Sequence, residues 1–255
     1  MKLATWNVNS IRARQDAVLD WLGRNEPDVL CMQETKVVDD DFPTDEFLRL
    51  GYAIATAGQK TYNGVAIATR LPMRDVTIGL VGEEDPVDKR AIAVTVGDTR
   101  VYSVYVPNGK SPLLPAFQEK LAWLARLAET VVHASKSYEA LAICGDFNVA
   151  PDDRDVYDPE VLRGQLHFHP DEHRALEHLV ALGLVDLFRR HHVDDKQYSW
   201  WDYRAGAFRR NLGLRIDLIL ATKSLADKCV AADIDVEPRR GEKPSDHTPV
   251  VATFR

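Results

Sequence analysis

Acidic and amide side chains follow several short apolar runs, where they could act together on a phosphate ester. Glu34 follows Val29–Gln33, and Asp146 and Asn148 follow Ala140–Cys144. The loops after strands are where a rigid scaffold presents functional groups. Carboxylate and amide oxygens are the ligands that Mg²⁺ and Mn²⁺ prefer. These residues therefore predict a divalent-metal site suited to phosphodiester hydrolysis.

Four further polar residues fit the same site. Asn7 ends the first apolar run, and Asp246 and His247 immediately precede the last one. We expect Glu34 and Asp246, helped by Asn7, to hold one metal ion. His247 could donate a hydrogen bond to a phosphate oxygen. Asp217 interrupts an apolar run, and because a buried carboxylate needs a partner, we expect it to orient His247.

Each of these residues also has a structural explanation when taken alone. Asn7 and Asp246 could cap turns, Glu34 could be a surface carboxylate, and Gly, Asp and Asn favour turns such as the one after Cys144. A single shared site explains all of them at once. Enzymes lower barriers by about 8–23 kcal/mol and a general base alone supplies about 3–5, so a site with several parts is required.

Composition is that of a soluble globular enzyme, with 255 residues, 45% of them hydrophobic and 28% charged. Three scattered cysteines favour buried thiols and do not fit a disulfide framework or a cysteine-based zinc site. The first residues lack the apolar core of a signal peptide, and no apolar run approaches the roughly 20 residues of a membrane span. We therefore expect a cytoplasmic protein.

The net charge of −7 argues mildly against a nucleic-acid partner. The carboxylates of a metal site account for part of that charge, and what matters for such a partner is local clustering of basic residues. Solvated surface is the structural explanation of any one cluster. The clusters are Arg12/Arg14, Lys89/Arg90, Arg204/Arg209/Arg210/Arg215 and Arg239/Arg240/Lys243.

Residue patterns predict many short strands and three longer helices within one domain, residues 1–255, because no repeat or long linker is present. The expected strands are Lys2–Asn7, Val29–Gln33, Tyr52–Thr56, Gly64–Thr69, Ala91–Val96, Val101–Val106, Ala140–Cys144, Arg215–Ala221 and Pro249–Phe254. The expected helices are Ile11–Arg24, Leu114–Ser135 and Glu172–Leu182. Hairpins alternating with helical crossovers favour an α/β fold of two mixed sheets packed face to face with helices outside.

Six motifs stand in order along the chain. They are Trp6-Asn7-Val8-Asn9-Ser10-Ile11-Arg12, Gln33-Glu34-Thr35-Lys36, Tyr105-Val106-Pro107-Asn108-Gly109, Gly145-Asp146-Phe147-Asn148, Arg215-Ile216-Asp217-Leu218 and Ser245-Asp246-His247. Together they resemble the exonuclease III family of abasic-site endonucleases, within the endonuclease/exonuclease/phosphatase superfamily. The resemblance runs from the first predicted strand to the last, so coincidence is improbable.

The resemblance implies a four-layer α/β sandwich and a Mg²⁺- or Mn²⁺-dependent DNA-repair nuclease. Its substrates would be double-stranded DNA with abasic sites or with recessed or blocked 3′ ends, and the protein would act as a monomer. The metal site would comprise Asn7, Glu34, Asp146, Asn148, Asp246 and His247. The catalytic residues would be Tyr105, Asp146, Asn148, Asp217 and His247, with Asp146 activating the attacking water.

The resemblance also assigns substrate binding. The residues are Lys36, Asn108, Trp200, Arg204, Arg215 and His167. Physically, apolar walls near Trp200 suit a base-less sugar, and arginines suit phosphates. His167 could project into the abasic pocket and favour trimming of 3′ ends over internal cleavage, or it could be an exposed loop residue.

Two alternatives differ in class. Another phosphoesterase of the superfamily, acting on RNA, phosphoinositides or phospholipids, shares the Glu, Asp-x-Asn and Asp-His elements. The first motif and the Trp200 segment favour DNA instead. A catalytically silent DNA-binding module would have lost an acidic or histidine element, and none is missing.

Overall fold

Two six-stranded sheets lie face to face in the computed structural model, which describes residues 1–83 and 86–255. The first sheet has the order β11-β12-β1-β2-β4-β3 and the second β5-β6-β7-β8-β10-β9. The first contains β1 (Lys2–Asn7), β2 (Val29–Gln33), β3 (Ala53–Ala57), β4 (Val65–Thr69), β11 (Cys229–Ile234) and β12 (Val250–Phe254). The second contains β5 (Met73–Ile78), β6 (Ala91–Val96), β7 (Thr99–Tyr105), β8 (Ala140–Asp146), β9 (Leu184–Asp186) and β10 (Asp217–Thr222).

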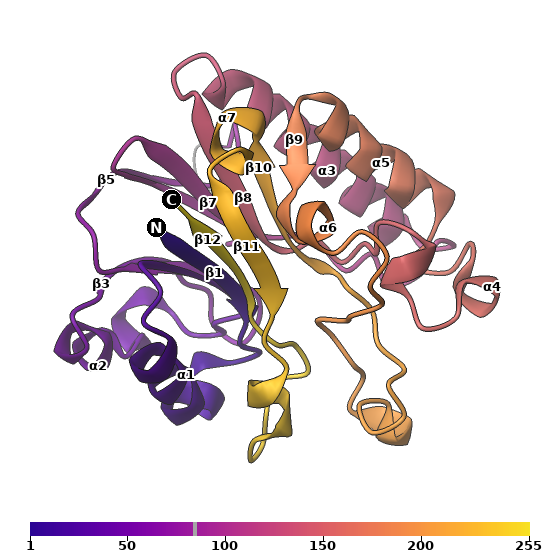
Figure 1. Cartoon of the computed structure of the whole chain (residues 1–255), viewed down its shortest axis with the longest axis horizontal. Coiled ribbons are helices and arrows are strands. Elements are labelled where there is room, and N and C mark those ends of the chain that lie inside the picture. Colours follow the sequence, from indigo (N-terminus) through magenta and orange to yellow (C-terminus); the bar gives the residue numbers. More distant parts are fainter. Residues whose placement is uncertain (84–85) are drawn as a thin grey trace.

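Helices cover the outer faces, which completes four layers (Figure 1). The first sheet is covered by α1 (Ile11–Asn25) and α2 (Thr44–Arg49), and the second by α3 (Pro115–Ala134) and α5 (Pro170–Ala181). Shorter elements are α4 (Pro159–Leu162), α6 (Leu187–His191), α7 (Lys223–Ala226), η1 (Asp39–Asp41), η2 (Asp153–Asp155), η3 (Arg204–Gly206) and η4 (Glu237–Arg240). The predicted α/β fold of two mixed sheets is confirmed, because β1–β2 and β7–β8 are parallel and the other pairs antiparallel.

Three apolar layers hold these elements together. The middle layer fills the space between the sheets with side chains such as Cys31, Ile67, Val94 and Cys144. The outer layers lie beneath the helices, where α1, for example, buries Trp21. Since residues alternate faces along a strand, strands buried on both faces read as continuous apolar runs. Such runs were therefore recognisable in the sequence.

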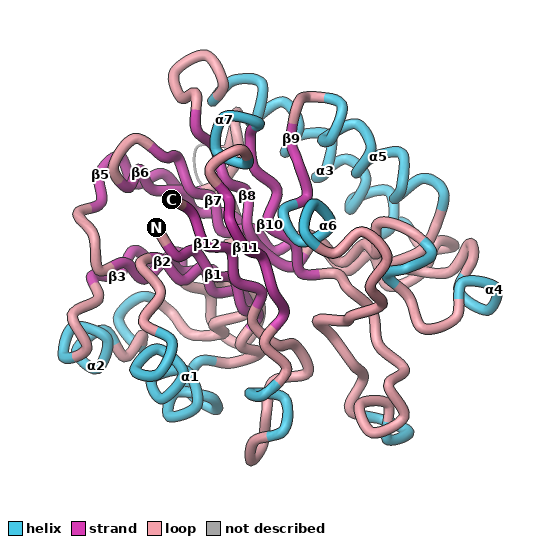
Figure 2. The backbone as a smooth tube through the Cα atoms, viewed as in Figure 1, coloured by secondary structure: helices cyan, strands magenta, loops and turns pink. Residues whose placement is uncertain are grey.

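Long loops leave one end of the sandwich, opposite the two chain termini (Figures 1 and 2). They include the orange and yellow segments in Figure 1 that carry η3 and η4. All nine predicted strands and three predicted helices are present, with ends that differ by at most two residues. The strands β5, β9 and β11 were not predicted, because β5 is largely exposed, β9 has three residues and β11 mixes buried with exposed positions.

Within the part of the chain that the structure describes, no helix combines the length and the apolar character needed to cross a bilayer. The longest, α3, has 20 residues and carries charged side chains along its exposed face.

Gly145 allows β8 to lie tightly against β7 just before Asp146. Its φ is 155°, and a Cβ atom there would lie 1.9 Å from the carbonyl oxygen of Val104. Gly145→Ala should therefore lower the free energy of unfolding by about 4 kcal/mol or more, measured by urea denaturation. Gly183→Ala is the control, since φ is 93° but the space is open, and about 1–2 kcal/mol is expected. Equal losses would contradict the close-approach explanation.

Candidate active site

Strand ends from both sheets meet at the loop-bearing end of the sandwich. In the first sheet Asn7 pairs with Gln33, so Glu34 follows directly beside it. In the second sheet Asp146 pairs with both Tyr105 and Asp217. Because the two sheets are stacked, the predicted acidic residues of each are brought to one place.

Asn7 connects the two sheets through its side-chain amide. It is fully buried, and its Nδ2 donates to Glu34 Oε1 and to Asp146 Oδ2, each at 2.9 Å. Its Oδ1 accepts the backbone N–H of Asn9 at 3.0 Å. An amide carries two donors and an acceptor oxygen with two lone pairs. Both donors therefore bind carboxylates, while the oxygen keeps capacity for another ligand.

One group in residues 1–83 and 86–255 brings three potential metal-ligating side chains together. The ligand atoms of Glu34, Asp146 and His247 all lie within 4.8 Å of one another. Asp246 is not a member of this group, and its oxygens accept Trp200 Nε1 at 3.0 Å and Asn9 Nδ2 at 2.8 Å. Within this group the close carboxylate partner of Glu34 is Asp146, and both belong to the predicted metal site. Hard carboxylate oxygens in this group suit Mg²⁺ or Mn²⁺.

His247 is held between two carboxylates. Its Nδ1 lies 2.8 Å from Asp217 Oδ2, and its Nε2 lies 3.6 Å from Asp146 Oδ2. Burial alone would lower its pKa, but Asp217 and Asp146 together raise the pKa of His247 to about 10. With Asp217 accepting at Nδ1, the Nε2–H faces Asp146 and the site. The imidazolium is therefore a hydrogen-bond donor at neutral pH.

Asp146 is a buried carboxylate with a shifted proton affinity. Burial raises its pKa to about 7, with further increases from Asp217 and Glu34 and opposing effects from His247 and Asn7. Its Oδ1 accepts the backbone N–H of Asn148 at 2.9 Å, which orients the group. A pKa near the working pH is what a general base requires.

Tyr105, Asn108 and Asn148 lie beside Asp146 in the loops and strand ends of the second sheet. Burial and the neighbouring Glu34 raise the pKa of Tyr105, so its hydroxyl stays protonated. Arg90 stacks over the Tyr105 ring at 4.9 Å. Asn148 Nδ2 donates to Val106 O at 3.0 Å, and its Oδ1 accepts Asn108 Nδ2 at 3.2 Å. The loops after β7 and β8 are therefore joined side chain to side chain.

Trp200 and His167 line the adjoining wall. The Trp200 ring lies 6.4 Å from His247 and 6.2 Å from His167, centroid to centroid. His167 is only partly exposed, and burial and the nearby Lys120 lower its pKa to about 3. His167 is therefore a neutral residue packed at the site, and the exposed-loop interpretation is wrong.

Two predicted substrate residues lie at the periphery. Lys36 pairs with Glu34 at 2.8 Å and donates to Asn9 Oδ1 at 2.5 Å. The Arg204 side chain is 88% exposed and pairs with Asp202.

Asn9 links Lys36 to Asp246, because its side chain accepts from Lys36 and donates to Asp246. Sequence reasoning did not assign this role. The two-residue spacing from Asn7 was the signal that could have indicated it.

Arg215 does not reach the site, and its predicted substrate contact is wrong. Its side chain is 1% exposed and pairs with Asp155 at 2.6 Å and Asp186 at 2.7 Å. Burial alone would lower the pKa of Arg215, but the two carboxylates outweigh this effect and raise the pKa above its ordinary value. The arginine lies in a run that begins a buried strand, so its charge is compensated inside the protein.

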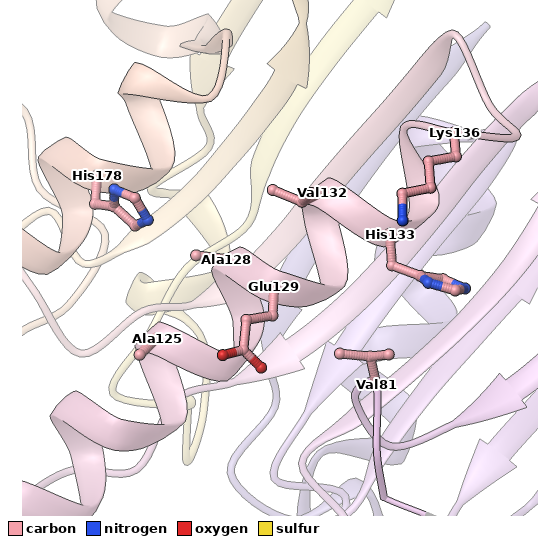
Figure 3. Close-up of a pocket in the computed structure, with 8 residues that line it drawn as sticks. All are labelled: Val81, Ala125, Ala128, Glu129, Val132, His133, Lys136 and His178. Carbon is pink, nitrogen blue, oxygen red and sulfur yellow. The ribbon is translucent and has the colours of Figure 1, made fainter.

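A pocket away from the candidate active site lies on the outer side of α3 and has a volume of about 440 Å³. It contains Glu129, His133 and His178, and Figure 3 shows the two histidines on different helices with their rings well apart. Within the described residues these side chains form no close metal-ligating group. The chemistry therefore concentrates at the other end of the fold.

Arg215→Met tests the structural assignment of this arginine. Removing one partner of a buried ion pair should lower the free energy of unfolding by about 3–5 kcal/mol. Chemical denaturation measures this loss, and Arg204→Met, which removes an exposed arginine, should change stability by less than about 0.5 kcal/mol. An Arg215→Met variant as stable as the parent would contradict this structural assignment.

Similar proteins share both sequence and fold. Residues 4–247 match the model of the Endonuclease/Exonuclease/phosphatase family. Exodeoxyribonuclease III of Haemophilus influenzae is 33% identical, with all of both chains covered. The structure of the 3′ phosphatase NExo from Neisseria bound to product DNA hairpin is 42% identical, covers 100% of this chain and 99% of that one, and has a TM-score of 0.98.

An AP endonuclease structure from Archaeoglobus fulgidus is 43% identical over 100% of this chain and 99% of that one, with a TM-score of 0.94. Both the family match and these similarities extend over nearly the whole chain. They agree with the six ordered motifs and with the strand ends that meet at the site. The chain therefore belongs to the Endonuclease/Exonuclease/phosphatase family and, within it, to the exonuclease III family.

Proposed function

We propose that this protein is a DNA-repair nuclease that hydrolyses phosphodiesters at abasic sites and at DNA 3′ ends. The observation that carries the proposal is the group of half-buried Glu34 with buried Asp146 and His247 at the common end of both sheets. The similar proteins are an exodeoxyribonuclease, a 3′ phosphatase and an AP endonuclease. Their names support DNA over RNA, phosphoinositide or phospholipid as the substrate.

The proposal includes a divalent cation, Mg²⁺ or Mn²⁺. Glu34, Asp146 and Asp246 would supply carboxylate oxygens, and Asn7 and Asn148 amide oxygens. Bound there, the ion would act as a Lewis acid on the phosphate and offset the negative charge of the carboxylates. Glu34, Asp146 and Asp217 are buried or half-buried around the single imidazolium of His247. Net negative charge therefore remains at the site for the ion to offset.

The residues of the chain then have separate tasks. Asp146 takes a proton from water, the water oxygen attacks phosphorus, and the bond from phosphorus to the 3′ oxygen breaks, with the leaving 3′ oxygen taking a proton from solvent water to become a hydroxyl. His247 donates Nε2–H to a phosphate oxygen. An imidazolium carries a proton on both nitrogens and has no free lone pair for a metal ion. We therefore assign His247 to the phosphate rather than to the predicted metal ligation. Asp217 orients His247, while Tyr105 and Asn148 position the phosphate.

DNA would lie across the loop-bearing end of the sandwich. Lys36, Asn108 and Arg204 would contact the phosphate backbone, and Trp200 would line the pocket for the sugar. We further propose that the protein works as a monomer in a bacterial cytoplasm, associated with the nucleoid. The Haemophilus relative supports a bacterial setting.

A cleavage assay on duplexes with an internal abasic analogue or a recessed 3′ end tests the function. We expect cleavage that a chelator abolishes and Mg²⁺ restores, and a fall of about 10²–10⁴-fold in kcat for Asp146→Asn. Asp227→Asn is the matched control, since this carboxylate pairs with Lys223 on the surface. Cleavage that survives chelation would refute the proposed metal dependence. Hydrolysis of RNA or phospholipid, with no cleavage of DNA, would favour another superfamily activity.

His167→Gly tests the pocket. The imidazole occupies room beside Trp200, where a sugar flanked by DNA on both sides must enter, whereas a 3′ end can approach from one side. We expect the ratio of abasic-site cleavage to 3′-phosphate removal to rise roughly tenfold. Glycine also suits the φ of 71° at this position. His133→Ala, on the outer face of α3, serves as the control, and an unchanged ratio would dismiss the idea.

A further inference from the structure

A buried lysine lies beneath the candidate active site and touches three separate segments. Lys120, on α3, and Glu172, on α5, have side chains that are 0% exposed. The Lys120 ammonium donates to the backbone oxygen of Asn148 at 2.6 Å, to that of Asn108 at 3.3 Å, and to the carboxylate of Glu172. An ammonium has three N–H donors, so all of them are used.

Each of these contacts fixes a different part of the site. Asn108 belongs to the loop that follows Tyr105, and Asn148 belongs to the loop that follows Asp146. Glu172 Oε2 also accepts the backbone N–H of His169 at 3.0 Å, which anchors the start of α5 behind His167. One ammonium therefore sets the spacing among three segments.

The Asn148 carbonyl is the centre of this arrangement. It accepts both Lys120 Nζ and His167 Nδ1, each at 2.6 Å. Because a carbonyl oxygen only accepts, Nδ1 of His167 carries the proton. Asn148 has a φ of 52°, a left-handed conformation that asparagine adopts more readily than most residues. Lys120 and His167 hold it from two sides.

Stability alone explains such a pair poorly. Replacing a buried ion pair by apolar residues of similar volume is often neutral or stabilising. Position 120 also lies on the apolar face of α3, three residues after Phe117 and four before Leu124, both buried. The neighbouring Leu121 is only half-buried, so the lysine takes the more deeply buried position. A lysine in this position has a use other than packing.

We propose that Lys120, held in place by Glu172, is a positioning residue for DNA cleavage. It fixes the loops that carry Tyr105 and Asp146 and the segment that carries His167 at their working separation. The proposal rests on the proposed nuclease function. Lys120 is fully buried and contacts no substrate, so it acts through those loops.

The test compares Glu172→Gln with Lys120→Met/Glu172→Gln, which differ only at residue 120. The glutamine can still accept the His169 N–H. We expect the double variant to lose about 10²-fold in kcat relative to Glu172→Gln, because loop misplacement of about 1 Å has such an effect. KM for DNA and Kd measured with chelator should change less than threefold, and Tm should stay within a few degrees.

Arg100→Met is the control for general destabilisation. Arg100 is a buried cation at the opposite end of β7, where it donates to Thr77, Thr95 and the Asp75 carbonyl. We expect a lower Tm with kcat unchanged well below Tm. Equal kcat in the two residue-120 backgrounds, or a loss of kcat that follows Tm in all variants, would overturn the proposal.

The parent protein separates this proposal from the function on which it rests. No DNA cleavage by the parent would refute the nuclease function, whereas cleavage by the parent and by the double variant at equal rates would refute the role of Lys120 alone. If the methionine variant fails to fold, Lys120→Gln/Glu172→Gln replaces it. Its two amides can hydrogen-bond to each other, and the same loss of kcat is expected.

Discussion

The site depends on keeping negative charge buried where two sheets meet. Asp146 and Asp217 are buried with Glu34 beside them, and each isolated carboxylate would cost several kcal/mol to desolvate. His247 lies between the two aspartates, and Asn7 donates to Asp146 and Glu34. These donors allow the carboxylates to remain where a cation and a phosphate would complete the balance.

The sandwich makes this concentration of charge possible. A single sheet would present Asn7 and Glu34, or Asp146 and Asp217, but not both pairs. Stacking two mixed sheets places parallel strand ends from each at the same end of the molecule, and Gly145 permits the close β7–β8 contact just before Asp146. The central apolar layer packs the two sheets against each other, and the helices cover their outer faces.

Periodicity and motif order predicted the fold and most of the site's members, because the strands are buried on both faces and the polar residues stand at their ends. Contacts between distant segments were not predictable in that way. Asn9 links Lys36 to Asp246, and Arg215 is bound by Asp155 and Asp186, residues with no local signal. Edge strands such as β5 were missed because solvent exposure removes the apolar pattern.

The Asn7 side chain has a wider consequence, since its two donors bind carboxylates carried by different sheets. The amide reaches only a short distance, so with Glu34 bound in its own sheet the bond to Asp146 forms only within a narrow range of inter-sheet separations. Packing errors anywhere in the central layer, however remote from the loops, change that separation. The geometry of the site therefore depends on the packing between the two sheets as well as on the residues at the strand ends.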